Sequence, residues 1–261
     1  MNLLQLTQLT DKLFYNNSNS YKVIQSKQKE LLEIIKPTTD IKKINYKVIQ
    51  NYIQQLQNKD NKPATINSKT AYLSHILNYA YHNQLINNKP YIPYMKIIKT
   101  KEKYITPKEA MRMLAYCEAH SQPELYNIIL IGLYTGLRIN NILSLTKENY
   151  QNGCLYIYDK KTNENFIIPV AEKIKSIIVN FKGFKIDYNK CYYLFNLMKK
   201  ELNLDEQITI HTLRHTFCSN LIQKGVPITT IQKLANHKKI TTTMRYAHLS
   251  QEQLKNAIDI L

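Results

Sequence analysis

The sequence has few acidic residues, and this shortage is informative. Its 261 residues include 19 aspartates and glutamates against 36 lysines and arginines, which leaves a formal net charge of +17 at pH 7. Because the excess is spread along the chain and is not confined to a tail, it favours a polyanionic partner, either nucleic acid or an anionic membrane. A basic surface that is merely solvated is the alternative interpretation.

Paired cysteines are missing as well. The four cysteines lie far apart in the chain, at Cys117, Cys154, Cys191 and Cys218. Such spacing excludes a zinc site built from paired cysteines and a disulfide framework. We therefore expect four reduced cysteines that serve as packing residues.

The chain also lacks a long apolar run. The longest one, around residues 128–134, is too short to span a bilayer. The N-terminus, MNLLQLTQLT, has neither the basic region nor the continuous apolar core of a signal peptide. These absences predict a cytoplasmic protein without a membrane partner.

Apolar periodicity divides the chain into four segments. Residues 1–20 end in the polar run NNSNS and are predicted to form a flexible N-terminal segment. Residues 21–94 repeat apolar side chains at helical spacing, which predicts a small all-helical domain. Residues 95–104 carry a basic run without a helical period and are interpreted as a basic interdomain linker. A second, larger domain is expected over residues 105–261.

This second domain is expected to be mainly helical. Helices are predicted over 107–120 and 123–134, the latter very apolar, and a helical pattern returns over 171–202. Residues 155–158 and 166–170 flank the turn-forming stretch DKKTNEN and predict a β hairpin. The predicted fold class is therefore mainly α with a small β hairpin or sheet, in two domains.

The stretch from His211 to Tyr246 organises the chain chemically. It reads HTLRHTFCSNLIQKGVPITTIQKLANHKKITTTMRY. His211 and Arg214 are three residues apart and so share one face of a predicted helix. Asn236 tolerates the left-handed conformation that ends helices, so His237 is expected at a corner.

The side chains of this stretch suit chemistry on a phosphodiester. When a phenolic oxygen attacks phosphorus, negative charge gathers on the non-bridging oxygens. A guanidinium can donate two hydrogen bonds to these oxygens, and imidazoles can donate or shuttle protons. Tyrosine is a poor nucleophile at its ordinary pKa of about 10 and needs such neighbours. Few carboxylates lie near, which argues against two-metal hydrolysis because that chemistry needs acidic ligands.

The same stretch resembles the second conserved box of the tyrosine recombinases, the family of phage integrases and Xer-type resolvases. In that family H-x-L-R-H precedes a Gly-His pair, and a tyrosine follows nine residues after that histidine. Here the corresponding residues are HTLRH, the pair Asn236-His237 and Tyr246. The family's first box, T-G-L-R, is intact and ends at Arg138. Five residues in this order and spacing are far more specific than H-x-x-R alone.

A lysine completes the resemblance. The family carries it in a β hairpin, eight residues before a proline that closes the second strand, and this spacing to Pro169 selects Lys161 over Lys160. Two positions depart from the family pattern. Asn141 stands where an acidic residue is usual, which is expected to weaken the orientation of the active-site arginine and histidine groups. Asn236 replaces a glycine, which is sterically mild.

The resemblance implies a DNA clamp that cleaves and rejoins strands through a 3'-phosphotyrosine. The implied catalytic residues are Arg138, Lys161, His211, Arg214, His237 and Tyr246. Tyr246 would attack the scissile phosphate while the two arginines stabilise the charged transition state. His211 would assist proton transfer, His237 would donate to a phosphate oxygen, and Lys161 would protonate the leaving oxygen.

Partners follow from the same resemblance. It implies double-stranded DNA, a dimer on one site and a tetramer in the synapse, with no metal, organic cofactor or small-molecule substrate. An apolar stripe after Tyr246 predicts a tail helix that packs either on a neighbouring protomer or on its own chain. Three questions stay open. They are the target sequence, whether cleavage occurs within or between protomers, and whether the role is integration or excision of a mobile element or Xer-like dimer resolution.

Two other functions are compatible with parts of the sequence. One is a non-catalytic, sequence-specific DNA-binding protein of the same fold. The other is a metal-dependent nuclease, for which the sequence offers no acidic cluster. His211 and His215 are four residues apart, but Thr212 stands where the zinc-protease pattern needs glutamate. We therefore predict no metal ligands and interpret His215 as structural.

Overall fold

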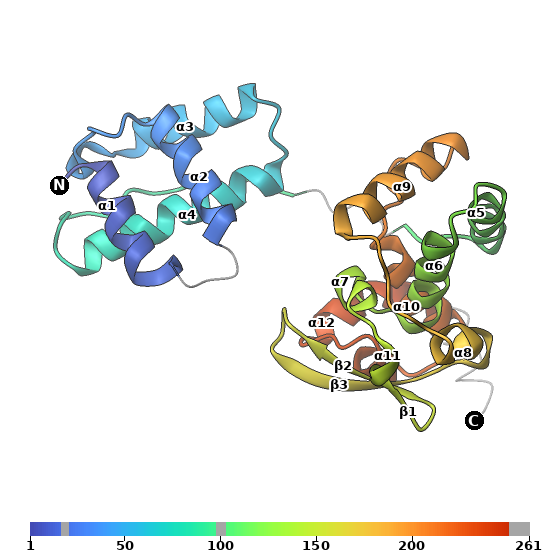
Figure 1. Ribbon diagram of the computed structural model, residues 1–261. Helices are drawn as coiled ribbons and strands as arrows, with labels where there is room; N and C mark the ends of the chain where they lie inside the picture. The colour runs from blue at the N-terminus through green and yellow to red at the C-terminus, as the bar shows by residue number, and fades with distance from the viewer. Residues whose placement is uncertain (17–20, 98–102, 251–261) are drawn as a thin grey trace, which may run out of the picture. The chain divides into compact units, whose positions relative to one another are not determined.

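The computed structural model of the protein describes residues 1–16, 21–97 and 103–250, with the backbone alone for 248–250. The chain forms two compact units, Met1–Thr100 and Lys101–Leu261, here called the N-terminal and C-terminal units (Figure 1). The predicted tail helix lies outside the described residues.

The described part of the N-terminal unit is built from helices around one apolar core. Its elements are α1 (Leu3–Thr10), the π-helix η1 (Asp11–Tyr15), α2 (Tyr21–Ile34), the 3-10 helix η2 (Ile41–Lys43), α3 (Tyr46–Asn58) and α4 (Pro63–His82). The longest of them, α4, starts with Pro63, whose fixed φ and missing N–H suit a first helical turn. It contacts α1, α2 and α3 and buries Leu73, Ile76 and Leu77 completely.

The predicted flexible segment over residues 1–20 is wrong for the part that the structure describes. Helix α1 opens with a capping box between Asn2 and Gln5, and its Leu3 and Leu6 are fully buried. Asn2 also forms a β-bridge with Asp40. The leucines are spaced for one helical face, and burying them against α4 offsets the entropy of ordering this short helix. Residues 17–20 lie outside the described residues.

The C-terminal unit is mainly helical with a small antiparallel sheet, which confirms the predicted fold class. Its helices are α5 (Pro107–Ala119), α6 (Pro123–Thr135), α7 (Ile139–Leu143), η3 (Lys147–Asn149), α8 (Glu172–Val179), α9 (Tyr188–Glu201), α10 (Thr212–Gln223), α11 (Ile228–Leu234), α12 (Ile240–Thr243) and η4 (Met244–Ser250). The strands β1 (Tyr150–Gln151), β2 (Cys154–Asp159) and β3 (Glu164–Pro169) pair in the order β1-β2-β3.

Helix α6 is the centre of this unit. Ile128, Ile129 and Ile131 are fully buried, and α6 contacts α5, α7, α8, α9 and α10. Its approach to α10 is close, because a Cβ atom added at Gly132 would lie 3.0 Å from Leu213. This close contact also bears on the predicted arginines, since Arg138 follows the end of α6 by three residues and Arg214 lies in the first turn of α10.

The sheet places a turn beside α7. Strands β2 and β3 pair from Cys154 opposite Pro169 to Asp159 opposite Glu164, so the turn begins after Asp159. One face of the hairpin is buried through Leu155, Ile157 and Ile168, and α7 contacts β2 (Figure 1). The predicted hairpin is confirmed.

The C-terminal unit differs from the sequence predictions in two local features. The helical pattern over 171–202 contains two helices, because residues 180–187 interrupt it before Asp187 caps α9 through the Lys190 N–H. Strand β1 was not predicted, because two residues are too few to show alternation.

Candidate active site

Arg138 is placed by a sharp end to α6. Gly136 has φ +64°, the left-handed conformation that terminates a helix, and Arg138 follows as the N-cap residue of α7. The Thr135 hydroxyl donates to the Ile131 carbonyl at 2.6 Å and accepts from the Leu137 N–H at 3.2 Å. The turn therefore sets the direction in which the arginine leaves the end of the helix.

Three of the predicted residues, Arg138, Lys161 and His211, line one open pocket of about 530 Å³. The full lining is Arg138, Ile139, Asn140, Asn141, Ser144, Tyr158, Asp159, Lys160, Lys161, Tyr188 and His211. It combines the start of α7, the β2–β3 turn, and residues at the beginning of α9 and just before α10. Asp159 is the only carboxylate among these described lining residues, so the pocket is basic and suits an anion.

Lys161 occupies the β2–β3 turn and is exposed. Its backbone N–H donates to Oδ1 of Asp159 at 2.9 Å, while its side chain is free to extend into the pocket that it lines. Lys238 holds the other side of the turn, because its ammonium donates to the Thr162 carbonyl at 3.0 Å and lies 3.4 Å from Glu164. The backbone of the turn is thus fixed on two sides around an accessible lysine.

Arg214 lies on α10, outside the pocket lining, and is buried, with 4 % of its surface exposed. Its guanidinium donates to the carbonyl of Gly136 at 2.8 Å and to the carbonyl of Ala235. Burial, followed by the charge of Arg138, lowers the pKa of Arg214 to about 10, so it stays charged at neutral pH. This arginine therefore joins the ends of α6 and α11 as well as supplying positive charge.

Two histidines flank the arginines. His211 is the N-cap residue of α10, and His237 is buried with Nδ1 2.9 Å from the Thr243 hydroxyl. Desolvation and then the charges of His215 and Arg214 lower the pKa of His211 to about 4. Burial and then Arg214 lower the pKa of His237 to about 3. Both rings are neutral at pH 7 in the unliganded protein.

The corner at His237 is present as predicted. Asn236 has φ +48°, which confirms that it takes the left-handed conformation after α11. The Asn236 carbonyl also accepts a long hydrogen bond of 3.4 Å from Arg138. The corner thus brings the residue before His237 to the arginine of the pocket.

Tyr246 lies on η4 and is buried, with 2 % of its surface exposed. Its phenol oxygen is hydrogen-bonded to Nδ1 of His215, and the residue is absent from the pocket lining. Burial raises the pKa of Tyr246 well above its usual range, whereas Arg245 and Arg214 act in the opposite direction. In this conformation the phenol is protonated and shielded at neutral pH.

His215 contacts two of the predicted site residues. Interpreted from the sequence as structural, it is hydrogen-bonded to Tyr246, and its ring stands perpendicular to that of His211, with 4.9 Å between the ring centres. Its spacing of four from His211 indicated that both rings share a helical face. Nothing in the sequence pattern indicated that Tyr246, 31 residues later, lies on the same side.

All six predicted residues occupy one electrostatic neighbourhood. The pKa of His211 responds to Arg214, Arg138 and Lys161, besides His215. That of His237 responds to both arginines, and that of Tyr246 responds to Arg214. Three of the residues line the pocket and three are buried outside its lining. Within the described ranges, no three histidine, cysteine, aspartate or glutamate side chains are grouped so that they could hold a metal ion.

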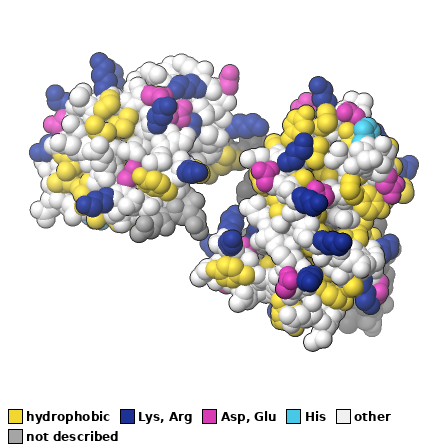
Figure 2. All heavy atoms as spheres, in the orientation of Figure 1, with side chains coloured by type: hydrophobic (Ala, Val, Ile, Leu, Met, Phe, Trp, Pro, Cys, Tyr) yellow, Lys and Arg dark blue, Asp and Glu magenta, His cyan; other side chains and the backbone are white. Residues whose placement is uncertain are grey.

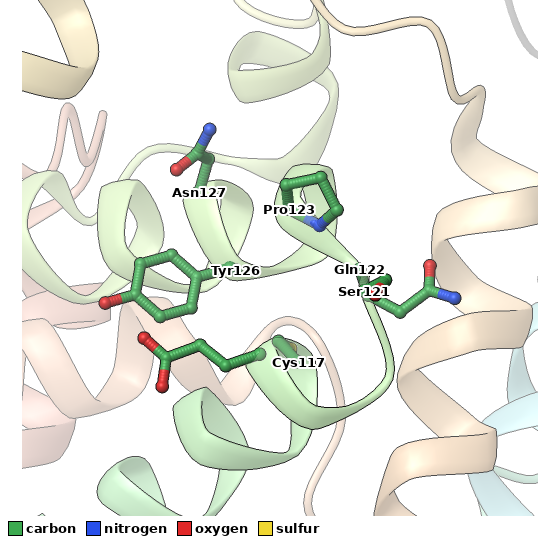
Figure 3. A pocket seen from close by; sticks show the side chains of 7 residues that line it. Cys117, Ser121, Gln122, Pro123, Tyr126 and Asn127 are labelled. Carbon is green, nitrogen blue, oxygen red and sulfur yellow. The ribbon is translucent and has the colours of Figure 1, made fainter.

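Another pocket has a different character. It lies at the connection between α5 and α6, has a volume of about 410 Å³, and is lined by Cys117, Glu118, Ser121, Gln122, Pro123, Tyr126 and Asn127 (Figure 3). Burial raises the pKa of the Cys117 thiol to about 12, so this cysteine is not an activated nucleophile. The pocket contains none of the six predicted residues.

The two-unit, mainly helical fold and the basic pocket are matched by family models that cover both units. A model of the phage integrase family matches residues 103–253, and a model of the phage integrase SAM-like domain matches residues 6–101. The chain belongs to the phage integrase family.

Curated relatives agree with this assignment. The chain is 28 % identical over 206 residues to a putative integrase of Pseudomonas phage Pf1, covering 76 % of this chain and 62 % of the relative. It is 26 % identical over 208 residues to the integrase of Haemophilus phage HP1, covering 77 % and 61 %. It is also 25 % identical over 240 residues to the tyrosine recombinase XerC of Staphylococcus aureus, covering 80 % and 78 %. The chain thus spans about three fifths of the two phage integrases.

Solved structures share the fold. The Tn1549 transposon integrase in complex with a circular intermediate DNA matches with a TM-score of 0.84 at 21 % identity, covering 100 % of both chains. A lambda integrase dimer bound to a COC' core site matches with a TM-score of 0.80 at 19 % identity, covering 93 % of this chain and 97 % of that one. In the described residues, no helix is both long and apolar enough to cross a membrane.

Proposed function

We propose that this protein is a site-specific DNA recombinase that cleaves and rejoins DNA through a 3'-phosphotyrosine. It would serve integration or excision of a mobile element, or Xer-like dimer resolution. The observation that supports this most directly is the basic pocket lined by Arg138, Lys161 and His211, with Arg214, His237 and Tyr246 in the same neighbourhood. Membership of the phage integrase family supports it independently.

In the proposed cleavage step, the Tyr246 oxygen attacks the scissile phosphorus and the bond from phosphorus to the 5'-oxygen breaks. The phenol loses its proton with the assistance of His211, which is neutral in the free protein and so is able to accept it. Lys161 donates a proton to the departing 5'-oxygen. Rejoining is the reverse reaction, in which a 5'-hydroxyl attacks the phosphotyrosine.

Charge stabilisation is assigned to the basic residues around the pocket. Arg138 and Arg214 offset the charge that develops on the non-bridging oxygens, and His237 donates a hydrogen bond to one of them. No metal, nucleotide or organic cofactor enters the proposed reaction, because the covalent link conserves the energy of the broken bond for rejoining.

The proposed attack requires Tyr246 to leave its buried position. Its hydrogen bond to His215 and its raised pKa make the phenol unreactive in the free protein. Because η4 is a short 3-10 helix, moving it breaks few backbone hydrogen bonds. In the proposal, binding of DNA supplies the phosphate toward which the tyrosine turns.

The proposed partner is double-stranded DNA, bound by a dimer at one site and by a tetramer in the synapse. Among structures of the same fold, lambda integrase is described as a dimer bound to a core site and as a tetramer bound to a Holliday junction. The charge of this chain, +17, supports a polyanionic partner.

The decisive experiment is covalent trapping on nicked duplexes tiled across the DNA that flanks the gene. The nick lets the short cleaved strand diffuse away, so a protein-DNA adduct that resists denaturation accumulates. We expect an adduct in the presence of EDTA from the wild-type protein and none from Tyr246→Phe, with DNA binding retained in both. Tight, sequence-specific binding without an adduct would instead support the non-catalytic alternative. Cleavage that stops in EDTA would support a metal-dependent nuclease.

A further inference from the structure

A buried carboxylate, that of Asp159, lies among the basic residues that line the pocket. Asp159 ends β2 with 1 % of its surface exposed, and its Oδ2 forms an ion pair with Arg138 at 2.5 Å. An unpaired carboxylate is strongly unfavourable in a buried position, so the ion pair with Arg138 stabilises both side chains where they are.

The second carboxylate oxygen has a different partner. Oδ1 accepts from the backbone N–H of Lys161 at 2.9 Å. The Asp159 carbonyl accepts from the N–H groups of Thr162 and Asn163, at 3.1 and 2.8 Å. One aspartate therefore holds the guanidinium of Arg138 with one oxygen and the turn that carries Lys161 with the other.

Two nearby residues, Asn141 and Glu164, do not replace Asp159 in these contacts. Asn141, three residues after Arg138, is buried and uncharged, and its side-chain nitrogen has no hydrogen-bond partner. Glu164 lies opposite Asp159 in the strand register but is exposed and pairs with Lys238. The connection between the pocket arginine and the lysine turn thus passes through Asp159.

We infer that Asp159 is a positioning residue that couples Arg138 to Lys161 for the proposed cleavage step. Its carboxylate sets the direction of the guanidinium that receives the phosphate and, through the turn, the position of the lysine that protonates the leaving oxygen. This inference rests on the proposed function. It assigns to Asp159 the carboxylate role that Asn141 is unable to perform, and Asp159 itself does not touch the DNA.

Two substitutions separate the two contacts. Asp159→Asn keeps an oxygen that accepts from the Lys161 N–H but removes the charge that holds Arg138. Asp159→Ala removes both contacts. Glu172→Gln is the control, because it removes an exposed carboxylate that pairs with Lys175 and lies outside the pocket lining.

The first measurement is the single-turnover rate of adduct formation on the nicked duplex. We expect Asp159→Asn and Asp159→Ala to be roughly tenfold to a hundredfold slower than wild type, because misplacing a catalytic group by about 1 Å costs that much. DNA affinity should be unchanged or higher, since a negative charge near the phosphate is lost. Glu172→Gln should match wild type.

The second measurement uses a duplex in which sulfur replaces the bridging 5'-oxygen at the scissile phosphate. A thiolate leaves without a proton from a general acid, so this substrate removes the need for Lys161. We expect it to restore part of the lost rate in Asp159→Ala, where the lysine turn is released, and little in Asp159→Asn. A defect that arises only from general instability would respond equally in both variants.

A third measurement does not depend on cleavage. Amide hydrogen exchange at residues 159–165 should accelerate in Asp159→Ala and stay near the wild-type rate in Asp159→Asn, because only the first loses the bond to the Lys161 N–H. Absence of an adduct from wild type would reject the proposed function alone. Wild-type cleavage rates in both Asp159 variants, or unchanged exchange in Asp159→Ala, would overturn the positioning role.

A double-substitution cycle tests the coupling between Asp159 and Arg138, and thermal unfolding tests for misfolding. If Asp159 acts through Arg138, combining Asp159→Asn with Arg138→Lys should be no slower than the slower single variant. Rates that multiply would mean that the two residues act independently, which contradicts the inference. Thermal unfolding of each variant identifies any protein that is not folded at the assay temperature.

Discussion

At the scale of single residues, burial separates the roles of the basic groups. Arg138 lines the pocket, whereas Arg214 uses its guanidinium on the carbonyls of Gly136 and Ala235. His237 is likewise buried, and its position is tied to Thr243. Residues proposed for catalysis therefore also hold the site together, so substituting them alters stability as well as rate.

The buried histidine predicts a pH dependence of stability. The folded-state pKa of His237 is about 3, below the ordinary value of 6.5 that it recovers on unfolding. Between these values the unfolded chain binds more protons, so the free energy of unfolding decreases as pH falls below 6.5. The largest contribution from one such group is about 1.4 kcal/mol per pH unit. Urea unfolding at pH 7, 6 and 5 should show a shallower pH slope for His237→Asn than for wild type; equal slopes would contradict the assignment.

At the scale of elements, the site depends on how helices end and on one turn. Helix α6 stops at Gly136, α11 stops before Asn236, and both ends are connected to Arg214 or Arg138 through main-chain carbonyls. The turn after β2 adds Lys161. Arg138, Lys161 and His237 therefore each lie just after a regular element has ended, where the backbone takes a defined, non-repeating conformation.

Gly136→Ala should damage both folding and the site. The position has φ +64°, and an added Cβ would lie 2.3 Å from the Phe217 ring, so the strain and the clash together should cost about 2–4 kcal/mol. Gly153→Ala is the matched control, because φ is +79° but nothing lies within 4 Å, and we expect a loss of about 1 kcal/mol. Chemical denaturation measures both. Equal losses in the free energy of unfolding would show that the clash between the added Cβ and Phe217 contributes nothing.

The hairpin turn allows its two lysines to be compared. Lys161→Ala should reduce the rate of adduct formation by roughly a hundredfold on ordinary DNA, within the range for loss of a general acid. Much less reduction is expected on the 5'-sulfur duplex. Lys160→Ala, which changes the neighbouring exposed residue, should weaken binding slightly without this difference between substrates. A substrate-dependent defect in Lys160→Ala alone would move the general-acid role to that residue.

At the scale of the whole molecule, positive charge is distributed over both units. Residues 1–100 contain 14 lysines and five acidic residues, and the C-terminal unit carries the rest of the excess. Figure 2 shows lysine and arginine side chains spread over the visible face of each unit, with acidic side chains between them. Such a distribution favours many separate phosphate contacts over one concentrated patch.

Binding should therefore depend steeply on salt. If the protein contacts about six to ten phosphates, its affinity for duplex DNA should fall by at least about a thousandfold between about 50 and 200 mM salt, because counterions are released on binding. Fluorescence anisotropy with a labelled duplex measures this slope. Tyr246→Phe should show the same slope, since it changes no charge. A nearly salt-independent affinity would argue against phosphate contacts as the main source of binding.

Much of the site was predictable because it depends on local spacing. The helix end at Gly136, the left-handed corner at Asn236 and the hairpin around Lys161 each follow from a few neighbouring residues. The roles proposed for the six residues remain predictions. The prediction of a flexible segment over residues 1–20 is wrong because the burial of Leu3 depends on contact with α4, which lies far along the chain and is not visible in the local sequence.

The sequence by itself determined the mainly helical class, the hairpin and the family, since these depend on periodicity, turn chemistry and motif order. Only the tertiary structure decided that Asp159 pairs with Arg138 and that His215 holds Tyr246, across 21 and 31 residues. Short-range order is set by propensities that each segment carries with it. Such long-range pairs form only when the packing of α6, α10 and β2 brings those particular side chains within hydrogen-bonding distance.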